Sequence, residues 1–138
     1  MGSDSESKIV LGAVAPQFVV EDVVRAAEHY RDVLGFEITD TFLDPPVHII
    51  VTRGYCQVFL ARANGETGTS NRRLKPEAID AYFRVRGVEA LAEELRSKGA
   101  DIVEGPVRRS YDMLELVVKD ADGFVLVFGE DVGAIPAV

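Results

Sequence analysis

Residues 18–38 read FVVEDVVRAAEHYRDVLGFEI, and residues 83–102 read FRVRGVEALAEELRSKGADI. The two stretches match at these pairs: Phe18 with Phe83, Val20 with Val85, Val23 with Val88, Arg31 with Arg96 and, after a gap of one residue, Gly35 with Gly99 and Ile38 with Ile102. An internal repeat of this kind indicates two copies of one supersecondary unit. Corresponding positions in the two copies should therefore face the same way in the fold.

Each copy predicts a strand, a helix and three further strands. In the first copy, an apolar run over residues 10–20 reads as a buried strand. Asp22 is suited to cap the following helix, and Gly35 is suited to end it. The later strands of this copy are expected at residues 36–42, 48–52 and 56–61. The second copy predicts a strand at residues 79–85, a helix that ends at Lys98 and Gly99, and strands at residues 101–103, 113–118 and 124–128.

The predicted fold class is α+β, with two tandem β-α-β-β-β modules in a single domain. A polar segment with few apolar residues separates the copies, which is typical of a linker. The expected boundaries are a disordered lead-in at residues 1–8, a domain at 9–131 (module one 9–62, linker 63–76, module two 77–131) and a tail at 132–138.

Composition excludes several classes of function. The formal net charge is −8, whereas binding to nucleic acid requires clustered Lys and Arg. No apolar run is long enough to cross a membrane, and the polar N-terminus lacks the apolar stretch of a secretion signal. Cys56 is the only cysteine, which excludes an intrachain disulfide and a thiolate metal cluster. We therefore expect a cytoplasmic protein without nucleic-acid or membrane partners.

The motifs of the two copies together resemble those of the vicinal oxygen chelate superfamily, which contains glyoxalase I, extradiol dioxygenases and bleomycin-resistance proteins. The resemblance covers about residues 13–130 and rests on these positions: Pro16, Phe18, Val20, Asp22, Ala26, Tyr30, Leu34, Gly35, Phe36, Tyr111, Met113, Glu115, Asp120, Asp122 and Gly123. It implies mixed sheets that curl around a shared cleft, and a homodimer. The bleomycin-resistance branch is the nearest match.

Enzymes of this superfamily bind a divalent metal in the cleft, so the matching positions can be inspected. The first-strand histidine of the family corresponds to Ala15, and the same place in the second module is Asp80. The glutamate of the closing strand corresponds to Val127. Alanine and valine offer no lone pair, and one carboxylate does not make a catalytic metal site. We expect no metal and no cofactor.

Strand alternation and the resemblance together predict which side chains line the cleft. In the first strand of each module, one face carries apolar side chains toward the helix, and the other face carries the polar side chains. Tyr111 and Glu115 lie where the bleomycin-resistance branch tends to carry an aromatic residue and an acid. The candidate ligand-binding residues are Gln17, Val19, His48, Gln57, Phe59, Asp80, Tyr82, Arg84, Tyr111 and Glu115.

Asp80 and Arg84 lie too far apart on one strand to neutralise each other easily. If both are partly buried, each requires another partner or a ligand, because an unpaired buried charge is costly. In the alternative interpretation, Asp80 frays into solvent at the start of the strand while Arg84 pairs with Glu115 or Glu130.

Three functions are compatible with these features. The first is a metal-free protein of the bleomycin-resistance type, which sequesters an amphipathic natural product in the cleft. The acidic chain favours a cationic ligand, and the ring of Phe59 would suit a planar one. The second is a metal-dependent lyase, isomerase or oxygenase with an altered ligand set, such as His48, Asp80 and Glu115. The third is a metal-free acid/base enzyme in which burial raises the pKa of Asp80 or Glu115.

Overall fold

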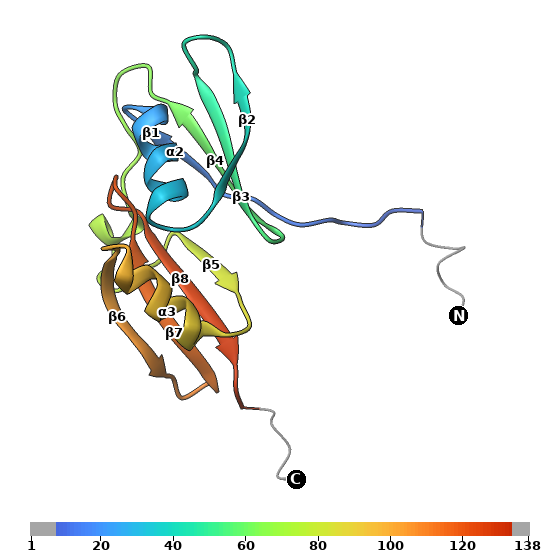
Figure 1. Ribbon diagram of the computed structural model, residues 1–138, viewed down its shortest axis with the longest axis vertical. Helices are drawn as coiled ribbons and strands as arrows, with labels where there is room; N and C mark the ends of the chain where they lie inside the picture. The colour runs from blue at the N-terminus through green and yellow to red at the C-terminus, as the bar shows by residue number, and fades with distance from the viewer. Residues whose placement is uncertain (1–7, 134–138) are drawn as a thin grey trace.

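The computed structural model describes residues 8–133 and contains two four-stranded sheets, each with one helix packed on one face (Figure 1). The first module contains β1 (Gln17–Val20), α2 (Val23–Asp32), β2 (Glu37–Phe42), β3 (His48–Arg53) and β4 (Cys56–Arg62). The second module contains β5 (Ala81–Arg84), α3 (Val88–Ser97), β6 (Asp101–Arg108), β7 (Met113–Lys119) and β8 (Val125–Asp131). A short 3₁₀ helix, η1 (Asn71–Arg73), lies in the linker. The predicted α+β fold of two β-α-β-β-β modules is confirmed.

The two sheets have the same topology, which confirms the internal repeat. The strand order is β1-β4-β3-β2 in sheet A and β5-β8-β7-β6 in sheet B. In each sheet the first strand of the module pairs in parallel with the last, and the other pairs are antiparallel. The register pairs Gln17 with Phe59 in sheet A and Tyr82 with Val127 in sheet B. Phe59 and Val127 are therefore equivalent positions of the repeat.

The two helices are capped in different ways. The Asp22 carboxylate accepts a hydrogen bond from the backbone N–H of Arg25 at 3.0 Å, as predicted for a helix cap. Gly87 precedes α3 with a left-handed backbone and has no side chain to act as a cap. A carboxylate from a distant strand replaces it, because Glu130 of β8 accepts the N–H of Val88 at 2.9 Å.

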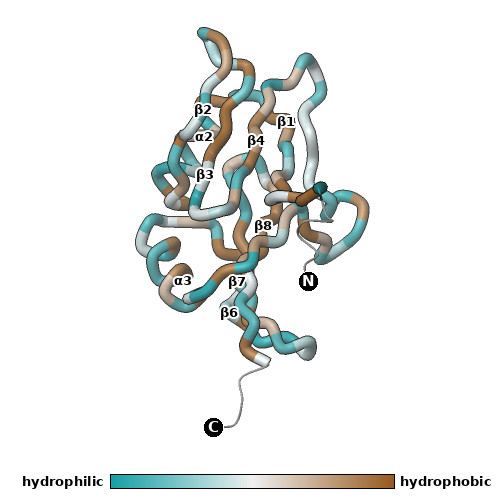
Figure 2. The backbone as a smooth tube through the Cα atoms, turned by 90° about the vertical axis from the view of Figure 1, so that its right-hand side faces the viewer, coloured by the Kyte–Doolittle hydropathy of each residue, from teal (hydrophilic) through white to brown (hydrophobic). Residues whose placement is uncertain are grey.

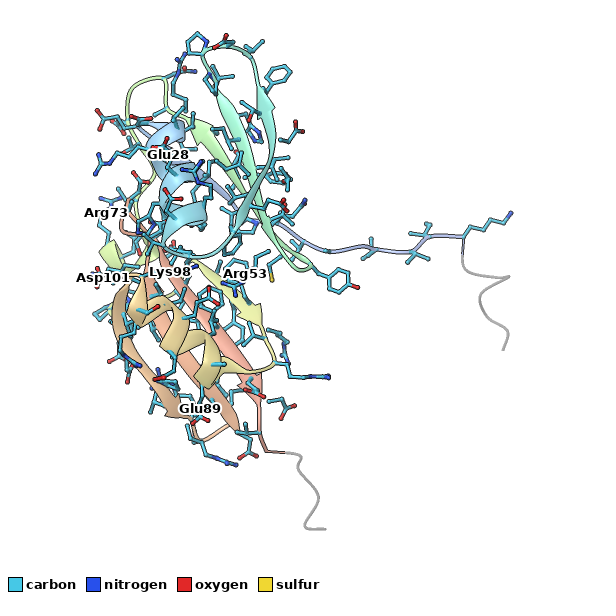
Figure 3. All side chains as sticks on the ribbon, viewed as in Figure 1. Glu28, Arg53, Arg73, Glu89, Lys98 and Asp101 are labelled. Carbon is cyan, nitrogen blue, oxygen red and sulfur yellow. The ribbon has the colours of Figure 1, made fainter. Side chains whose placement is uncertain are left out.

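One hydrophobic core spans both modules. The helix-facing side chains of the two sheets belong to a single cluster of buried residues, and hydrophobic stretches follow strands of both sheets in Figure 2. Phe18 of β1 stacks on Phe124 before β8, with ring centroids 4.2 Å apart. Arg53, at the end of β3, binds Glu94 of α3 across the junction that is visible in Figure 3. The modules therefore form one structural unit.

Two strands, β1 and β6, differ most from their predicted bounds. Residues 8–16 form no strand, and this segment leaves the body of the molecule as an extended arm (Figure 1). Its apolar side chains are open to solvent, since Val10 is 86% and Leu11 is 90% exposed. β6 is longer than predicted because Gly105 allows close approach to β7, where an added Cβ would collide with the carbonyl oxygen of Glu115.

Much of the predicted lead-in (residues 1–8) and of the predicted tail (132–138) lies outside the described residues. Neither α2 nor α3, the two α-helices of the described chain, has the length and apolar run needed to cross a bilayer.

Strand alternation leaves one face of each sheet without a helix. In β1 and β5 the helix-facing residues Phe18, Val20 and Phe83 are buried, as predicted. In β4 the same holds for Val58 and Leu60. The opposite face of each sheet, called here its open face, carries most of the predicted site residues.

Candidate functional site

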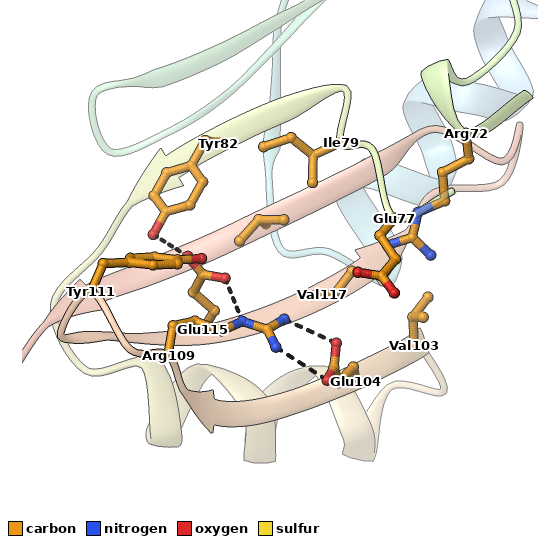
Figure 4. A pocket seen from close by; sticks show the side chains of 11 residues that line it. Arg72, Glu77, Ile79, Tyr82, Val103, Glu104, Arg109, Tyr111, Glu115 and Val117 are labelled. Atoms are coloured by element: carbon orange, nitrogen blue, oxygen red, sulfur yellow. Dashed lines mark hydrogen bonds and ion pairs between the residues drawn. The ribbon is translucent and has the colours of Figure 1, made fainter. Parts of the chain in front are cut away.

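A pocket of about 720 Å³ lies on the open face of sheet B (Figure 4). Its walls come from strands β5 to β8, from the β6–β7 turn and from the end of the linker. The lining residues are Arg72, Glu77, Ile79, Tyr82, Val103, Glu104, Arg109, Tyr111, Glu115, Val117 and Val127. Three predicted site residues, Tyr82, Tyr111 and Glu115, therefore meet in one pocket. Its volume is typical of pockets for small molecules.

Glu115 forms the centre of this pocket and is only 3% exposed. One carboxylate oxygen accepts hydrogen bonds from the hydroxyls of Tyr82 at 2.7 Å and Tyr111 at 2.8 Å. The other oxygen accepts Nε–H of Arg109 at 3.0 Å. A buried glutamate inside an apolar strand requires such hydrogen-bond partners, and Tyr82, Tyr111 and Arg109 provide them.

Arg109 extends the cluster to the rim of the pocket. Its two terminal nitrogens donate to the carboxylate of Glu104 at 2.9 and 3.3 Å (Figure 4). Sequence reasoning did not single out Arg109 or Glu104. The available signal was their position, since both lie in the segment that must pair with the strand carrying Glu115.

The electrostatics of the cluster keep Glu115 ionised. Burial by itself would raise the pKa of Glu115, but the hydrogen bonds from Tyr82, Arg109 and Tyr111 outweigh burial and lower it. Burial, with the bond to Glu115, raises the pKa of both tyrosines, so they remain neutral donors. The prediction that burial raises the pKa of Glu115 is wrong, because the surrounding donors stabilise the charged form.

Beyond the Glu115 cluster, the floor of the pocket is apolar, and the charged side chains of Arg72 and Glu77 lie at its linker end. A missing side chain also shapes the pocket. Val117 and Val127 form a small buried cluster beneath the ligand space, with Ile79 packed against it. Gly129 of β8 lies under the ring of Tyr82, and a Cβ at that position would collide with the tyrosine hydroxyl. Glycine at this position thus lets Tyr82 lie over the strand and reach Glu115.

The open face of sheet A holds a second group of predicted residues. His48 and Phe59 meet edge to face with ring centroids 5.6 Å apart, and the side-chain nitrogen of Gln17 lies 3.4 Å from Nε2 of His48. Gln57 donates to the hydroxyl of Thr52 at 3.3 Å. Within the described chain, none of these residues lines the Glu115 pocket. A single copy therefore presents two separate faces and not one shared cleft.

Asp80 has a structural role that the sequence interpretation missed. Its carboxylate accepts the backbone N–H of Asn71 at 2.7 Å and of Val125 at 2.8 Å. These bonds fix the linker and the start of β8 to the start of β5. Gln17 and Val19 lie with Asp80 along a small hollow of about 300 Å³ between β1, the linker and the start of β5. Asp80 neither frays into solvent nor lines the Glu115 pocket.

Arg84 also differs from expectation. It does not pair with Glu115 or Glu130, whose side chains bind other groups, and it lines a separate pocket between the modules. The arginine that binds Glu115 is Arg109, because the β6–β7 turn folds back over β7.

The donor set does not fit the metal that the fold family implies. The positions that match family ligands hold Ala15, Asp80 and Val127, and the repeat adds Phe59 as the partner of Val127. Val127 is buried among apolar side chains, while two backbone amides occupy the Asp80 carboxylate. Across residues 8–133, no three or more His, Cys, Asp or Glu side chains converge as metal ligands would. These positions therefore do not provide the ligand set of a catalytic divalent metal.

Comparison with known proteins identifies the family. The sequence model of the Glyoxalase/Bleomycin resistance protein/Dioxygenase superfamily matches residues 11–128. The chain belongs to this superfamily, as its repeat, strand order and open sheet faces indicate. A comparison with curated proteins returned no match.

Solved structures with the same fold have low sequence identity to this chain. TioX from Micromonospora sp. ML1 is 18% identical, with a TM-score of 0.69 over 86% of this chain and 98% of that one. UcmS2 is 20% identical, with a TM-score of 0.68 over 88% and 98% of the two chains. Lactoylglutathione lyase from Agrobacterium tumefaciens is 15% identical, with a TM-score of 0.66 over 89% and 96%. At these identities the similarity establishes the fold alone.

Proposed function

We propose that this protein binds an amphipathic small molecule with a planar cationic part in the Glu115 pocket, and that it sequesters this molecule without a metal, in the manner of a bleomycin-resistance protein. The observation that carries the proposal is the Glu115 cluster itself. Its carboxylate is ionised and held by three donors in a pocket that also carries the apolar side chains of Ile79, Val117 and Val127. A few fixed polar groups among apolar surfaces are typical of small-molecule sites.

The orientation of the tyrosines supports a ligand that donates hydrogen bonds. Because both phenol protons point to Glu115, each phenol oxygen keeps lone pairs that can accept from a ligand. Tyr111 is 60% exposed and offers a ring on which a planar cation can stack. The charges of the lining residues are also slightly acidic, since three glutamates outnumber two arginines.

We also propose that a homodimer completes the site. Gln17, His48 and Phe59 lie on an open sheet face, and no part of the described chain brings them to the Glu115 pocket. A second copy that placed its sheet A over sheet B would combine both groups in one cleft. Such a cleft would contain all the predicted binding residues except Asp80 and Arg84.

The first test is titration with proflavine, a planar aromatic cation, followed by calorimetry and thermal shift. We expect saturable binding and a raised melting temperature in the wild type. Tyr111→Ala should weaken binding at least about tenfold, because it removes the exposed ring. Arg73→Gln, a change on the exposed linker, is the matched control and should bind as the wild type does. Absence of binding, or equal binding by Tyr111→Ala, would refute the proposal.

The dimer has its own test. Sedimentation equilibrium should give twice the chain mass, and Phe59→Ala should weaken proflavine binding although Phe59 is outside the Glu115 pocket of its own chain. A monomer, or unchanged affinity in Phe59→Ala, would refute the shared cleft.

Metal analysis of purified protein separates sequestration from the metal-dependent alternative, since tightly bound stoichiometric metal would favour an enzyme. The cytoplasmic location stays a prediction.

A further inference from the structure

A second pocket of about 530 Å³ lies at the junction of the two modules, away from the Glu115 pocket. The two pockets share no lining residue. One side comes from the β3–β4 turn of the first module, and the other comes from the end of β5 and the first turns of α3. The lining residues are Phe36, Arg53, Gly54, Tyr55, Cys56, Arg84, Val85, Arg86, Gly87, Ala90, Leu91, Glu94 and Phe128.

The floor of this junction pocket is apolar and rigid. Phe36 and Phe128 are 3% and 4% exposed, and both belong to the core that joins the modules. Val85 and Leu91 are partly buried and pack against the same core. Gly54 and Gly87 lie at the mouth with open space where a Cβ would stand, so no side chain closes the entrance there.

The rim carries three arginines in a chain with a net charge of −8. Of these arginines, Glu94 binds only Arg53, through both terminal guanidinium nitrogens at 2.7 and 2.8 Å, and it also pairs with Lys98 outside the pocket. Arg53 also donates to the carbonyl oxygen of Leu34 at 2.9 Å and is therefore fixed in place. Among the ion pairs and hydrogen bonds of the described chain, none involves the side chain of Arg84 or Arg86. Three arginines and one glutamate leave the lining with two excess positive charges.

We propose that the junction pocket is a second ligand site, which binds an aromatic carboxylate with its ring on the Phe36 and Phe128 floor and its carboxylate between Arg84 and Arg86. Guanidinium groups bind carboxylates through paired, charge-assisted hydrogen bonds. The fixed ion pair of Arg53 with Glu94 lines the same pocket and joins the two modules beside the ring. The ligand class is opposite in charge to the cation that the Glu115 pocket is proposed to bind.

The only cysteine of the chain gives this pocket a local reporter. Cys56 lines the junction pocket and is partly exposed. A bound ligand should therefore shield its thiol from N-ethylmaleimide, a reagent without charge. Suitable probes are 2-naphthoate and 2-naphthamide, which share one ring system and differ in charge. We expect 2-naphthoate to bind at least about tenfold more tightly than 2-naphthamide and to slow Cys56 labelling at saturation, with affinity that falls as salt is added.

Variants assign the effect to the arginines. Arg84→Gln with Arg86→Gln should reduce the preference for 2-naphthoate over 2-naphthamide to about twofold or less. Arg73→Gln alters the net charge on a different edge of the molecule, as Figure 3 shows relative to Arg53, and should retain the preference. A thermal melt of each variant confirms that it is folded. Equal binding of the two probes, unprotected Cys56 at saturating 2-naphthoate, or a preference that survives the double substitution would each overturn the proposal.

Discussion

Replacing Asp120 with Asn should change how the stability of this protein depends on pH. Asp120 lies in the turn before β8, is 5% exposed, and accepts the hydroxyl of Tyr30 at 2.7 Å. The backbone N–H groups of Asp122 and Phe124 donate to its other oxygen, each at 2.9 Å. Burial raises the pKa of Asp120 from 3.8 to about 6, although these hydrogen bonds oppose the shift.

The sign and size of the effect follow from this shift. Because the folded state holds the Asp120 proton more tightly than the unfolded state does, the group stabilises the fold fully below about pH 4. That contribution is lost as the pH rises through about 6. A shift of about two pKa units corresponds to about 3 kcal/mol of unfolding free energy. Asn keeps acceptors for the backbone amides but carries no charge at any of these pH values.

Urea unfolding at pH 4, 5, 6, 7 and 8 measures the prediction. The stability of the wild type minus that of Asp120→Asn should fall by about 2.4 kcal/mol from pH 4 to pH 8, with most of the change between pH 4 and 6. Glu66→Gln, which removes a carboxylate from the exposed linker, is the charge control and should retain the pH dependence of the wild type. A difference between wild type and Asp120→Asn that stays constant within about 0.5 kcal/mol would refute the burial argument.

Three further substitutions test the packing and the site. Glu115→Gln should show the opposite pH trend, because hydrogen bonds lower the pKa of Glu115 below 4.5 despite burial. The variant should have a clearly lower melting temperature than the wild type at pH 7, and this difference should shrink as the pH falls below about 4. An equal difference at pH 7 and below pH 4 would contradict the argument. Gly129→Ala should push Tyr82 off the strand and cost about 1–3 kcal/mol in urea unfolding; unchanged stability and proflavine binding would show that the close approach is unimportant. Phe18→Ala should cost about 3–5 kcal/mol by removing the stack on Phe124, and a loss below about 1 kcal/mol would refute a shared core.

Sequence periodicity was sufficient for the fold. The repeat placed equivalent residues on equivalent strands, and Asp22 caps its helix as its chemistry predicts. The prediction was wrong at residues 10–16, although β4 begins at Cys56 and so extends past the residue that pairs with Gln17. Pro16 accepts the N–H of Phe59 but has no N–H of its own with which to continue the ladder, and the chain before it leaves the sheet.

The site was less predictable because it depends on contacts between distant segments. Alternation along a strand placed Tyr82 on the open face of sheet B, and the family resemblance singled out Tyr111 and Glu115; all three line the pocket. It did not reveal that Arg109 folds over β7, or that Asp80 binds backbone amides of the linker and β8. A sequence pattern does not show which backbone N–H groups lie near a side chain. A carboxylate that accepts hydrogen bonds from backbone N–H groups can therefore be mistaken for a ligand-binding group.

The continuous hydrophobic cluster across the junction has a consequence for fragments of this chain. A polypeptide that ended in the linker would leave Phe18 and Phe36 facing water, because their aromatic neighbours Phe124 and Phe83 belong to the other half. Each half would then depend on a companion for solubility, although each carries a full set of strands and a helix. The chain should consequently unfold in one cooperative step. Cleavage in the linker would give two aggregation-prone fragments and not two independently folded proteins.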